Sequence, residues 1–225
     1  DSIVNCLLNE AEKNNIQIRL NTEIISIEKK ANGKFILLSK GADEIHADSI
    51  IITTGGSNKA EGYKWIHALG HSLKAPVPSL FTFNIPDNHI TKLMGVSVPH
   101  VKLKVAGSKI ESWGPLLITH WGMSGPVVLK TSAWGARELN QLNYSFGILI
   151  NWLPKYNEEK LRIEFNSLKT EYAAKTIVNT TYFELPKRLW EHLIFKSEIP
   201  DSTRWADLSK KQLNILINTL LNDSY

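Results

Sequence analysis

The 225-residue sequence contains a single cysteine, Cys6, and no apolar run long enough to cross a bilayer. One cysteine excludes an internal disulfide, which suits a reducing compartment. A membrane helix needs roughly 18 or more consecutive apolar residues, so a membrane span is excluded. No series of basic, apolar and small residues at the N-terminus resembles a signal peptide. We therefore expect a cytoplasmic protein with no membrane partner.

The positive charge of the chain is modest and scattered. The formal net charge is +4 and the isoelectric point is about 9.0, but Lys and Arg alternate with acids and form only short pairs such as Lys29-Lys30 and Lys210-Lys211. Nucleic-acid grooves need a clustered basic face, so we do not expect a nucleic-acid partner. Hydrophobic residues make up 43% of the chain, which is enough for a substantial core.

The first 40 residues predict a helix followed by short strands. An apolar stripe recurs at helical spacing in residues 2–14 and predicts a core-facing helix. Residues 16–20 alternate between apolar and polar side chains and predict a strand. Two further strands, 24–29 and 34–39, flank Asn32-Gly33, a dipeptide that accepts positive φ and is typical of hairpins. Since the chain starts inside a predicted helix, we expect it to be a piece of a longer protein.

A continuous β-branched run, residues 48–53, ends at Gly55-Gly56. Because it does not alternate, it predicts a central strand buried on both faces. In doubly wound sheets, ligands lie beyond the carboxyl ends of such strands, and glycine lets the backbone approach them closely. An ordinary strand-to-helix turn is the equal alternative. The next helix, 58–69, has Asn58 and Glu61 at capping-box spacing and Gly70 as its stop.

The remainder of the chain changes character twice. Prolines interrupt residues 76–100, and strict alternation from Val101 to Val105 predicts a half-exposed strand. Further strands are predicted at 116–119 and 144–152, and together they indicate an antiparallel β module. Three helices are predicted to follow. The first has an apolar face of Leu161, Phe165 and Leu168, and the second has Pro186 at a first-turn position. The third has Ser209 and Gln212 at capping-box spacing ahead of an apolar stripe formed by Leu213, Leu216, Ile217, Leu220 and Leu221.

A glycine-rich segment, Thr119–Pro126, is the main candidate for chemistry. His120 is the best acid/base residue, because histidine titrates near neutral pH. Ser124 and free N–H groups at the start of a helix over 127–134 can hold a carbonyl or carboxylate, although Ser124 can equally cap that helix. Neighbouring tryptophans such as Trp121 can form a ligand wall or fill a core. We expect no metal site, since Gly70 separates His67 from His71.

Taken in order, four stretches resemble the HI0933-like flavoprotein family, which includes enzymes related to a bacterial bile-acid reductase. The segment Thr119–Pro126 is similar to its Thr-His-Phe-Gly-x-Ser-Gly-Pro hallmark, with Trp121 in place of phenylalanine. Asp48–Gly56 resembles its Ala-Asp-x-apolar-run-Ala-Thr-Gly-Gly segment. The other matches are Ile18–Ile27, the paired elements Gly62-Tyr63 and Gly70-His71, and Pro76–Leu80.

This resemblance implies an α/β plus α+β fold. Residues 1–75 would be part of a doubly wound FAD-binding domain, 76–153 a β-barrel-like insert module and 154–225 a helical insert module. By position, the cofactor-binding residues would be the Ile24 backbone, Thr54, Gly55 and Gly56. A loop facing the flavin or substrate would contain Thr119, Trp121, Gly122 and Gly125, with His120 and Ser124 as catalytic residues.

The sequence departs from a complete flavin site, because it has no Gly-x-Gly-x-x-Gly after an opening strand. That turn places pyrophosphate on a helix N-terminus. We therefore expect a cytosolic FAD oxidoreductase acting on a small organic substrate, with NAD(P)H as a possible electron donor, whose isolated fragment is inactive without its own flanking segments. The alternative is a nonenzymatic interaction module that binds RNA.

Overall fold

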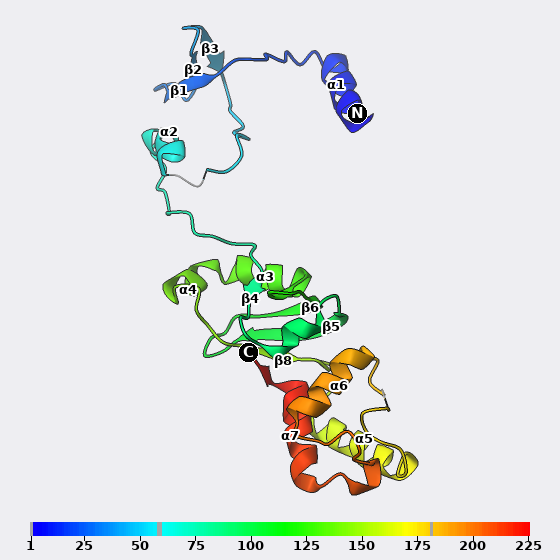
Figure 1. The fold of residues 1–225 in the computed structure, drawn as a ribbon. Helices are drawn as coiled ribbons and strands as arrows, with labels where there is room; N and C mark the ends of the chain where they lie inside the picture. The colour runs from blue at the N-terminus through cyan, green and yellow to red at the C-terminus, as the bar shows by residue number, and fades with distance from the viewer. Residues whose placement is uncertain (1, 58–59, 181) are drawn as a thin grey trace. The chain divides into compact units, whose positions relative to one another are not determined.

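A computed structural model of the chain describes residues 2–57, 60–180 and 182–225. It consists of two compact units, Asp1–Pro76 and Val77–Tyr225 (Figure 1). The predicted division of the second unit after residue 153 stays a prediction. In the part of the chain that the structure describes, no helix is long and apolar enough to span a membrane.

The first unit contains a small antiparallel sheet and short helices. Its strands, in the order β1-β2-β3, are Ile24–Lys29, Phe35–Ser39 and Glu44–Ala47. The hairpin predicted around Asn32-Gly33 is confirmed, with Glu28 opposite Ile36 and Gly33 at a φ of +83°. Strand β3 was not predicted. The helical elements are α1 (Ser2–Lys13), η1 (Ala60–Tyr63) and α2 (Lys64–Ala68).

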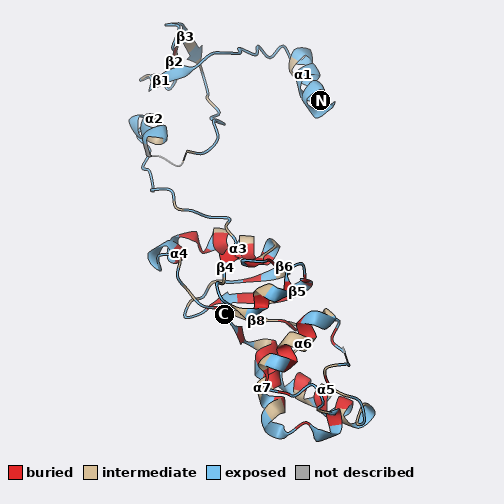
Figure 2. Cartoon of the chain, in the orientation of Figure 1, coloured by how far each residue is buried: buried red, intermediate tan, exposed pale blue. Residues whose placement is uncertain are grey.

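Two predicted strands of the first unit are wrong. Residues 16–19 and 49–53 have no regular structure, and Ile51 is 89% exposed. A strand buried on both faces needs neighbouring strands and covering helices, and no described strand pairs with either segment. The apolar stripe of α1 likewise faces solvent, with Ile3 76% exposed (Figure 2). The doubly wound sheet is therefore absent from the described residues of this unit.

The helix predicted over 58–69 is realised as η1 and α2, and Asn58 lies outside the described residues. Gly70 follows with a φ of +86°, the left-handed conformation expected of a helix stop. His71 comes after this glycine, so it does not continue the helix that carries His67.

The second unit is built on a six-stranded antiparallel sheet in the order β4-β7-β6-β5-β8-β9. Helix α3 packs against β6 and β5, and α4 follows it, while α5, α6 and α7 form a helical group (Figure 1). The strands are β4 Phe83–Asn84, β5 Ser97–Val105, β6 Glu111–Ile118, β7 Gly122–Ser124, β8 Ile148–Asn151 and β9 Asp223–Ser224. The helices are η2 His89–Leu93, α3 Pro126–Trp134, α4 Ala136–Gln141, α5 Glu158–Glu171, α6 Lys187–Lys196, η3 Trp205–Asp207 and α7 Lys210–Leu221.

Sequence periodicity explains most of this unit. In β5, Val101, Leu103 and Val105 are fully buried and Lys104 is exposed, as the alternation predicted. The capping box of Ser209 and Gln212 forms at the start of α7. Pro186 is the N-cap of α6 rather than its first helical residue, a small correction to the prediction.

The strand predicted over 144–152 is shorter than expected. Strand β8 begins only at Ile148, because Asn143 and Tyr144 take left-handed φ values of 51° and 57° that no strand accommodates. A single hydrophobic core joins the sheet to the helices of this unit (Figure 2), and its largest fully buried side chains include Trp152, Trp190 and Trp205.

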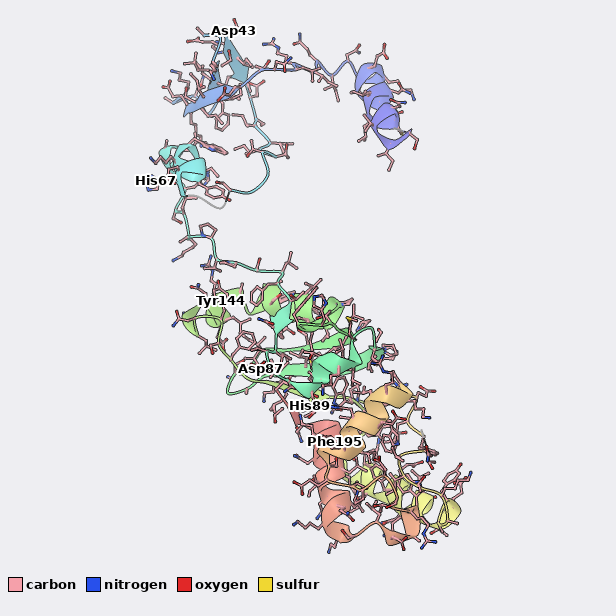
Figure 3. The ribbon with its side chains drawn as sticks, viewed as in Figure 1. Asp43, His67, Asp87, His89, Tyr144 and Phe195 are labelled. Atoms are coloured by element: carbon pink, nitrogen blue, oxygen red, sulfur yellow. The ribbon has the colours of Figure 1, made fainter. Side chains whose placement is uncertain are left out.

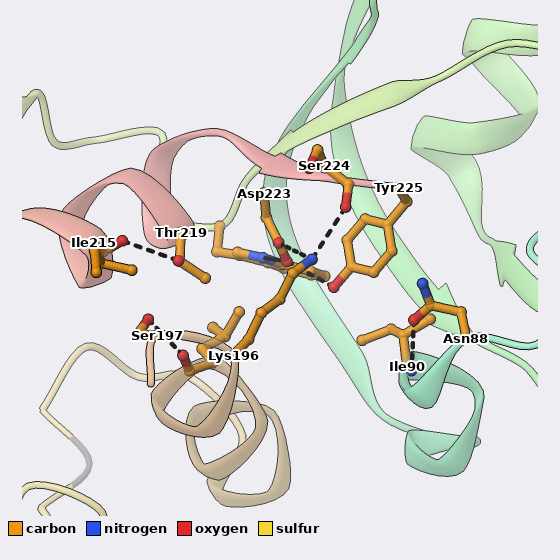
Figure 4. A network of polar contacts seen from close by, with 11 residues as sticks. Asn88, Ile90, Lys196, Ser197, Ile215, Thr219, Asp223, Ser224 and Tyr225 are labelled. Carbon is orange, nitrogen blue, oxygen red and sulfur yellow. Dashed lines mark hydrogen bonds and ion pairs between the residues drawn. The ribbon is translucent and has the colours of Figure 1, made fainter. Parts of the chain in front are cut away.

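A buried polar network fixes the end of the chain to this core (Figure 4). The Asp223 carboxylate, 2% exposed, accepts hydrogen bonds from Trp152 Nε1 at 2.9 Å and from the Tyr225 hydroxyl at 2.6 Å. Lys196 Nζ lies 2.5 Å from its other oxygen, as an ion pair without hydrogen-bond alignment. Burial lowers the pKa of nearby His192, and Lys196 lowers it further, whereas Asp223 raises it.

Candidate functional site

The segment Thr119–Pro126 forms a tight turn between β6 and β7 and then enters α3. Thr119 N donates to Gly122 O at 2.8 Å, and Gly122 N donates to Thr119 O at 3.4 Å. His120 and Trp121 therefore lie at the tip of the turn, exposed, with their ring centroids 4.2 Å apart in an edge-to-face arrangement. This geometry leaves the imidazole of His120 accessible to a reactant from solvent.

The two glycines of this turn allow backbones to pack closely. A Cβ on Gly122, whose φ is +151°, would overlap the Phe83 carbonyl oxygen and come 2.8 Å from Ile85 N. A Cβ on Gly125, whose φ is +98°, would come 2.9 Å from Pro115 O. Both glycines thus have a structural explanation in the packing of β7 against β4 and β6.

The start of α3 is less open than the sequence suggested. Gly125 is the N-cap and no side chain caps the helix, so the capping role considered for Ser124 is wrong. Pro126 has no N–H, and both Val128 N and Leu129 N donate to Gly125 O at 3.0 Å. Val127, fully buried, packs against Gly114 of β6. Ser124 itself is half-buried and uses its backbone to pair with Leu117.

Thr119 adds an unpaired polar atom to the same turn. The residue is 9% exposed, and its hydroxyl has no hydrogen-bond partner among the described residues. A buried hydroxyl without a partner costs about 1–3 kcal/mol, so such a group is rare unless water or a ligand satisfies it. Thr119 is therefore the residue of this segment whose environment most clearly calls for an additional polar partner.

The predicted cofactor residues of the first unit line two hollows. One, of about 300 Å³, contains Ile24 and Thr54, and the other, of about 530 Å³, contains Thr54, Gly55 and Gly56. The two hollows share Ile52, Thr54 and Trp65. Gly55 has a φ of +76°, and no atom of the described residues lies within 4 Å of an added Cβ, so its main chain is open to a ligand on that side. Their role in binding a cofactor remains a prediction.

Most of the second unit matches a known protein family. The family described as HI0933-like protein barrel and H2TH domain matches residues 77–223, more than half of the chain. The chain belongs to the HI0933-like family. The matched range covers the sheet from β4 to the first residue of β9 and the helices from α3 to α7.

Curated relatives of this HI0933-like chain carry names of enzymes. Ribosomal RNA dihydrouridine synthase of Escherichia coli is 30% identical over 97% of the chain and 53% of its own length, and that of Haemophilus influenzae is 27% identical over 97% and 54%. The 3-dehydro-bile acid delta(4,6)-reductase of Clostridium scindens is 25% identical over 96% and 54%. The chain thus spans about half the length of these relatives.

The HI0933-like unit also contains a cavity of about 520 Å³ that the sequence did not predict, and its walls include Phe81, Phe83, Tyr144, Phe146 and Tyr225. Phe81/Phe83 and Tyr144/Phe146 are each two residues apart, a spacing that places both rings of a pair on one face of extended chain. That pairing was the available signal, but the two segments lie about 60 residues apart and only the fold brings them together.

Proposed function

We propose that this chain is the central part of an FAD-dependent oxidoreductase that reduces a carbon–carbon double bond of uridine in ribosomal RNA. The observation that carries the proposal is the match along 97% of the chain to proteins named ribosomal RNA dihydrouridine synthase. Dihydrouridine differs from uridine by two hydrogens added across one double bond of the base. The bile-acid relative, matched over 96% of the chain, is likewise named a reductase.

Such a reduction needs one hydride and one proton. Bound FAD would supply the hydride, with NAD(P)H as the class of electron donor. The residues that would hold FAD are Ile24 through its backbone and the segment Thr54, Gly55 and Gly56. This assignment is supported by the hollows that these residues line and by the open main chain at Gly55. The flanking segments of the same protein would supply the pyrophosphate-binding turn.

The turn at 119–125 would supply the proton and orient the substrate. His120 is exposed at its tip and its imidazole can donate the proton to the carbon next to the one that receives hydride. The hydroxyl of Ser124, a half-buried residue, would hold the carbonyl that is conjugated to the double bond. The face of the turn that contacts the substrate ring would be formed by Trp121, Gly122 and Gly125.

The test uses the whole protein that contains this chain. Purified protein should show the visible absorbance band of oxidised flavin, which returns when FAD is added back after stripping. Dihydrouridine in ribosomal RNA should be restored when a deletion strain expresses the wild type. Removing a general acid typically lowers the rate about 10²- to 10⁴-fold, which is the loss expected of His120→Gln. His100→Gln is the matched control, since His100 is an exposed histidine on β5.

Two alternatives remain separate outcomes of these measurements. A small organic substrate, expected from the sequence, is favoured by the 25% identity to the bile-acid reductase; it would give a flavoprotein that leaves ribosomal RNA unmodified. A nonenzymatic RNA-binding module would be colourless and would bind RNA in a salt-dependent manner. The isolated 225-residue chain should bind FAD weakly by calorimetry, and tight binding would refute the idea that it needs its flanks.

A further inference from the structure

An aromatic cavity in the second unit is lined by β4, at one edge of the sheet, and by residues next to β8 and β9, at the other edge. Its volume is about 520 Å³, and its walls come from β4, from the segment 144–148 and from the chain end at Tyr225. Small-molecule sites typically occupy about 300–1,000 Å³ and are lined by apolar and aromatic side chains with a few polar groups. The cavity therefore has the size and lining of a ligand site.

The aromatic rings of the cavity are held by their neighbours. Phe81 meets Tyr144 edge to face with centroids 5.4 Å apart, and Phe83 meets Phe146 in the same way at 5.1 Å. The backbone of Phe81 is also held in place, because Phe81 N donates a hydrogen bond to the Ser132 hydroxyl in α3 at 3.0 Å. A rigid set of ring faces and edges favours a planar ligand, since stacking and edge contacts require fixed orientations.

Strained backbone surrounds the same cavity. Leu80 and Asp87, which bracket the β4 wall, have φ values of 56° and 55°, and Asn143 and Tyr144 at the opposite wall have 51° and 57°. Asparagine and aspartate tolerate this conformation, whereas leucine and tyrosine rarely adopt it, and strain of that kind collects at ligand sites and active sites. At Tyr144 (Figure 3), the strained turn directs a ring against the cavity, where Asn140 Nδ2 donates to its hydroxyl at 3.1 Å.

Polar groups at the cavity are available for a ligand. Thr82 and Asn84 are exposed and line it, and neither side chain has a hydrogen-bond partner within residues 2–57, 60–180 and 182–225. Because side chains alternate along a strand and Phe83 is buried, the Asn84 side chain leaves β4 on the opposite face from the Phe83 ring. Asn84 also pairs with Gly122 of β7, so the cavity wall adjoins the turn that carries His120.

We propose that this cavity binds an unpaired pyrimidine base of RNA, stacked among Phe81, Tyr144 and Phe146. The inference rests on the proposed function, because an enzyme that reduces uridine in RNA must take bases out of their stack. Proteins recognise single-stranded RNA by stacking splayed bases on aromatic side chains and by hydrogen bonds to their edges.

The test compares two RNA probes on the full chain by fluorescence anisotropy. A labelled single-stranded oligouridine is measured beside an abasic oligomer of the same length and charge, so that base binding separates from phosphate binding. Phe146→Leu, which keeps apolar volume without a ring, and Tyr144→Ala should weaken oligouridine binding about 5- to 150-fold. They should leave the abasic oligomer unchanged. Trp134→Ala is the control, since Trp134 is 83% exposed and lies outside the cavity.

Photocrosslinking locates the base directly. An oligomer with a single 5-iodouridine should crosslink to Tyr144 or Phe146, as mapped by mass spectrometry of peptides. The inference would be overturned by crosslinks confined to Trp113 or Trp121. It would also be overturned if the two probes bound equally, or if the variants bound oligouridine like the wild type. So would cholate binding that is lost in Phe146→Leu while oligouridine binding persists.

The proposed function fails on different readouts, namely whole protein without flavin and ribosomal RNA without dihydrouridine. Because binding to the cavity is measured with no turnover, either proposal can fail while the other stands.

Discussion

Replacing Asp223 with alanine should destabilise the second unit by about 3 kcal/mol. The carboxylate is 2% exposed and has three partners from separate parts of the fold, Trp152 in the segment after β8, Lys196 in α6 and the terminal Tyr225 (Figure 4). Alanine would leave the indole N–H and the phenol without an acceptor and the ammonium without its counter-ion. Trp152, Lys196 and Tyr225 would each lose the carboxylate that they share.

The magnitude follows from the burial of each partner. Breaking a buried ion pair from one side costs roughly 3–5 kcal/mol when the remaining charge has no access to water. The Lys196 side chain is 33% exposed and can turn towards solvent, which reduces that cost. Trp152 is 1% exposed and cannot reach water, so its unpaired N–H contributes about 1–3 kcal/mol. We therefore expect the lower end of the ion-pair range.

Urea unfolding followed by tryptophan fluorescence measures the effect. Asp223→Asn keeps an acceptor for Trp152 and should lose less stability than Asp223→Ala. Asp207→Ala is the matched control, because Asp207 forms an exposed ion pair with Arg204 at 2.9 Å, and exposed pairs contribute about 0–1 kcal/mol. A loss for Asp223→Ala no larger than that of the control would refute the view that the network stabilises the unit.

Three further predictions concern stability. Gly122→Ala should cost several kcal/mol in urea unfolding, because the added Cβ would overlap backbone atoms. Gly107→Ala should cost only about 1 kcal/mol for its φ of +73°, because no described atom lies within 4 Å of the added Cβ. Similar losses for the two variants would contradict this. Burial lowers the pKa of His192 in the folded protein. As pH falls through about 6.5, the unfolded chain therefore takes up a proton before the folded protein does, and the free energy of unfolding should decrease. His192→Gln should flatten this dependence of stability on pH. An unchanged profile would argue against it. Ser209→Ala should cost about 1 kcal/mol through loss of the cap of α7, and Ser202→Ala close to nothing, as thermal melts can check.

Local patterns predicted the elements that depend on their own residues. The hairpin at Asn32-Gly33, the alternation of Val101 to Val105 and the capping box of α7 each need only neighbours a few positions away, and each formed. The run at 48–53 was different, because a doubly buried strand depends on partner strands elsewhere. Two of its three isoleucines, Ile51 and Ile52, are exposed in the described structure, and Ile50 is half-buried.

The candidate site shows the same division. The sequence identified His120, Ser124 and the glycines around them as one segment, since they are adjacent in the chain. It could not show that Gly122 and Gly125 face other backbones, or that Gly125 rather than Ser124 is the N-cap of α3. Nor could it show that the Thr119 hydroxyl is buried with no hydrogen-bond partner in the part of the chain that the structure describes. Those facts depend on how β4, β6 and β7 pack against one another.

Periodicity and motif order in the sequence were enough to predict local elements and a family resemblance, which the match to residues 77–223 supports. Contacts between distant residues came from the fold: the rings of Phe81 and Phe83 meet those of Tyr144 and Phe146, and Asp223 meets Trp152 and Lys196. Helix and strand propensities act over only a few residues. Cavities and buried polar networks arise instead from packing and desolvation between segments that the chain itself keeps far apart.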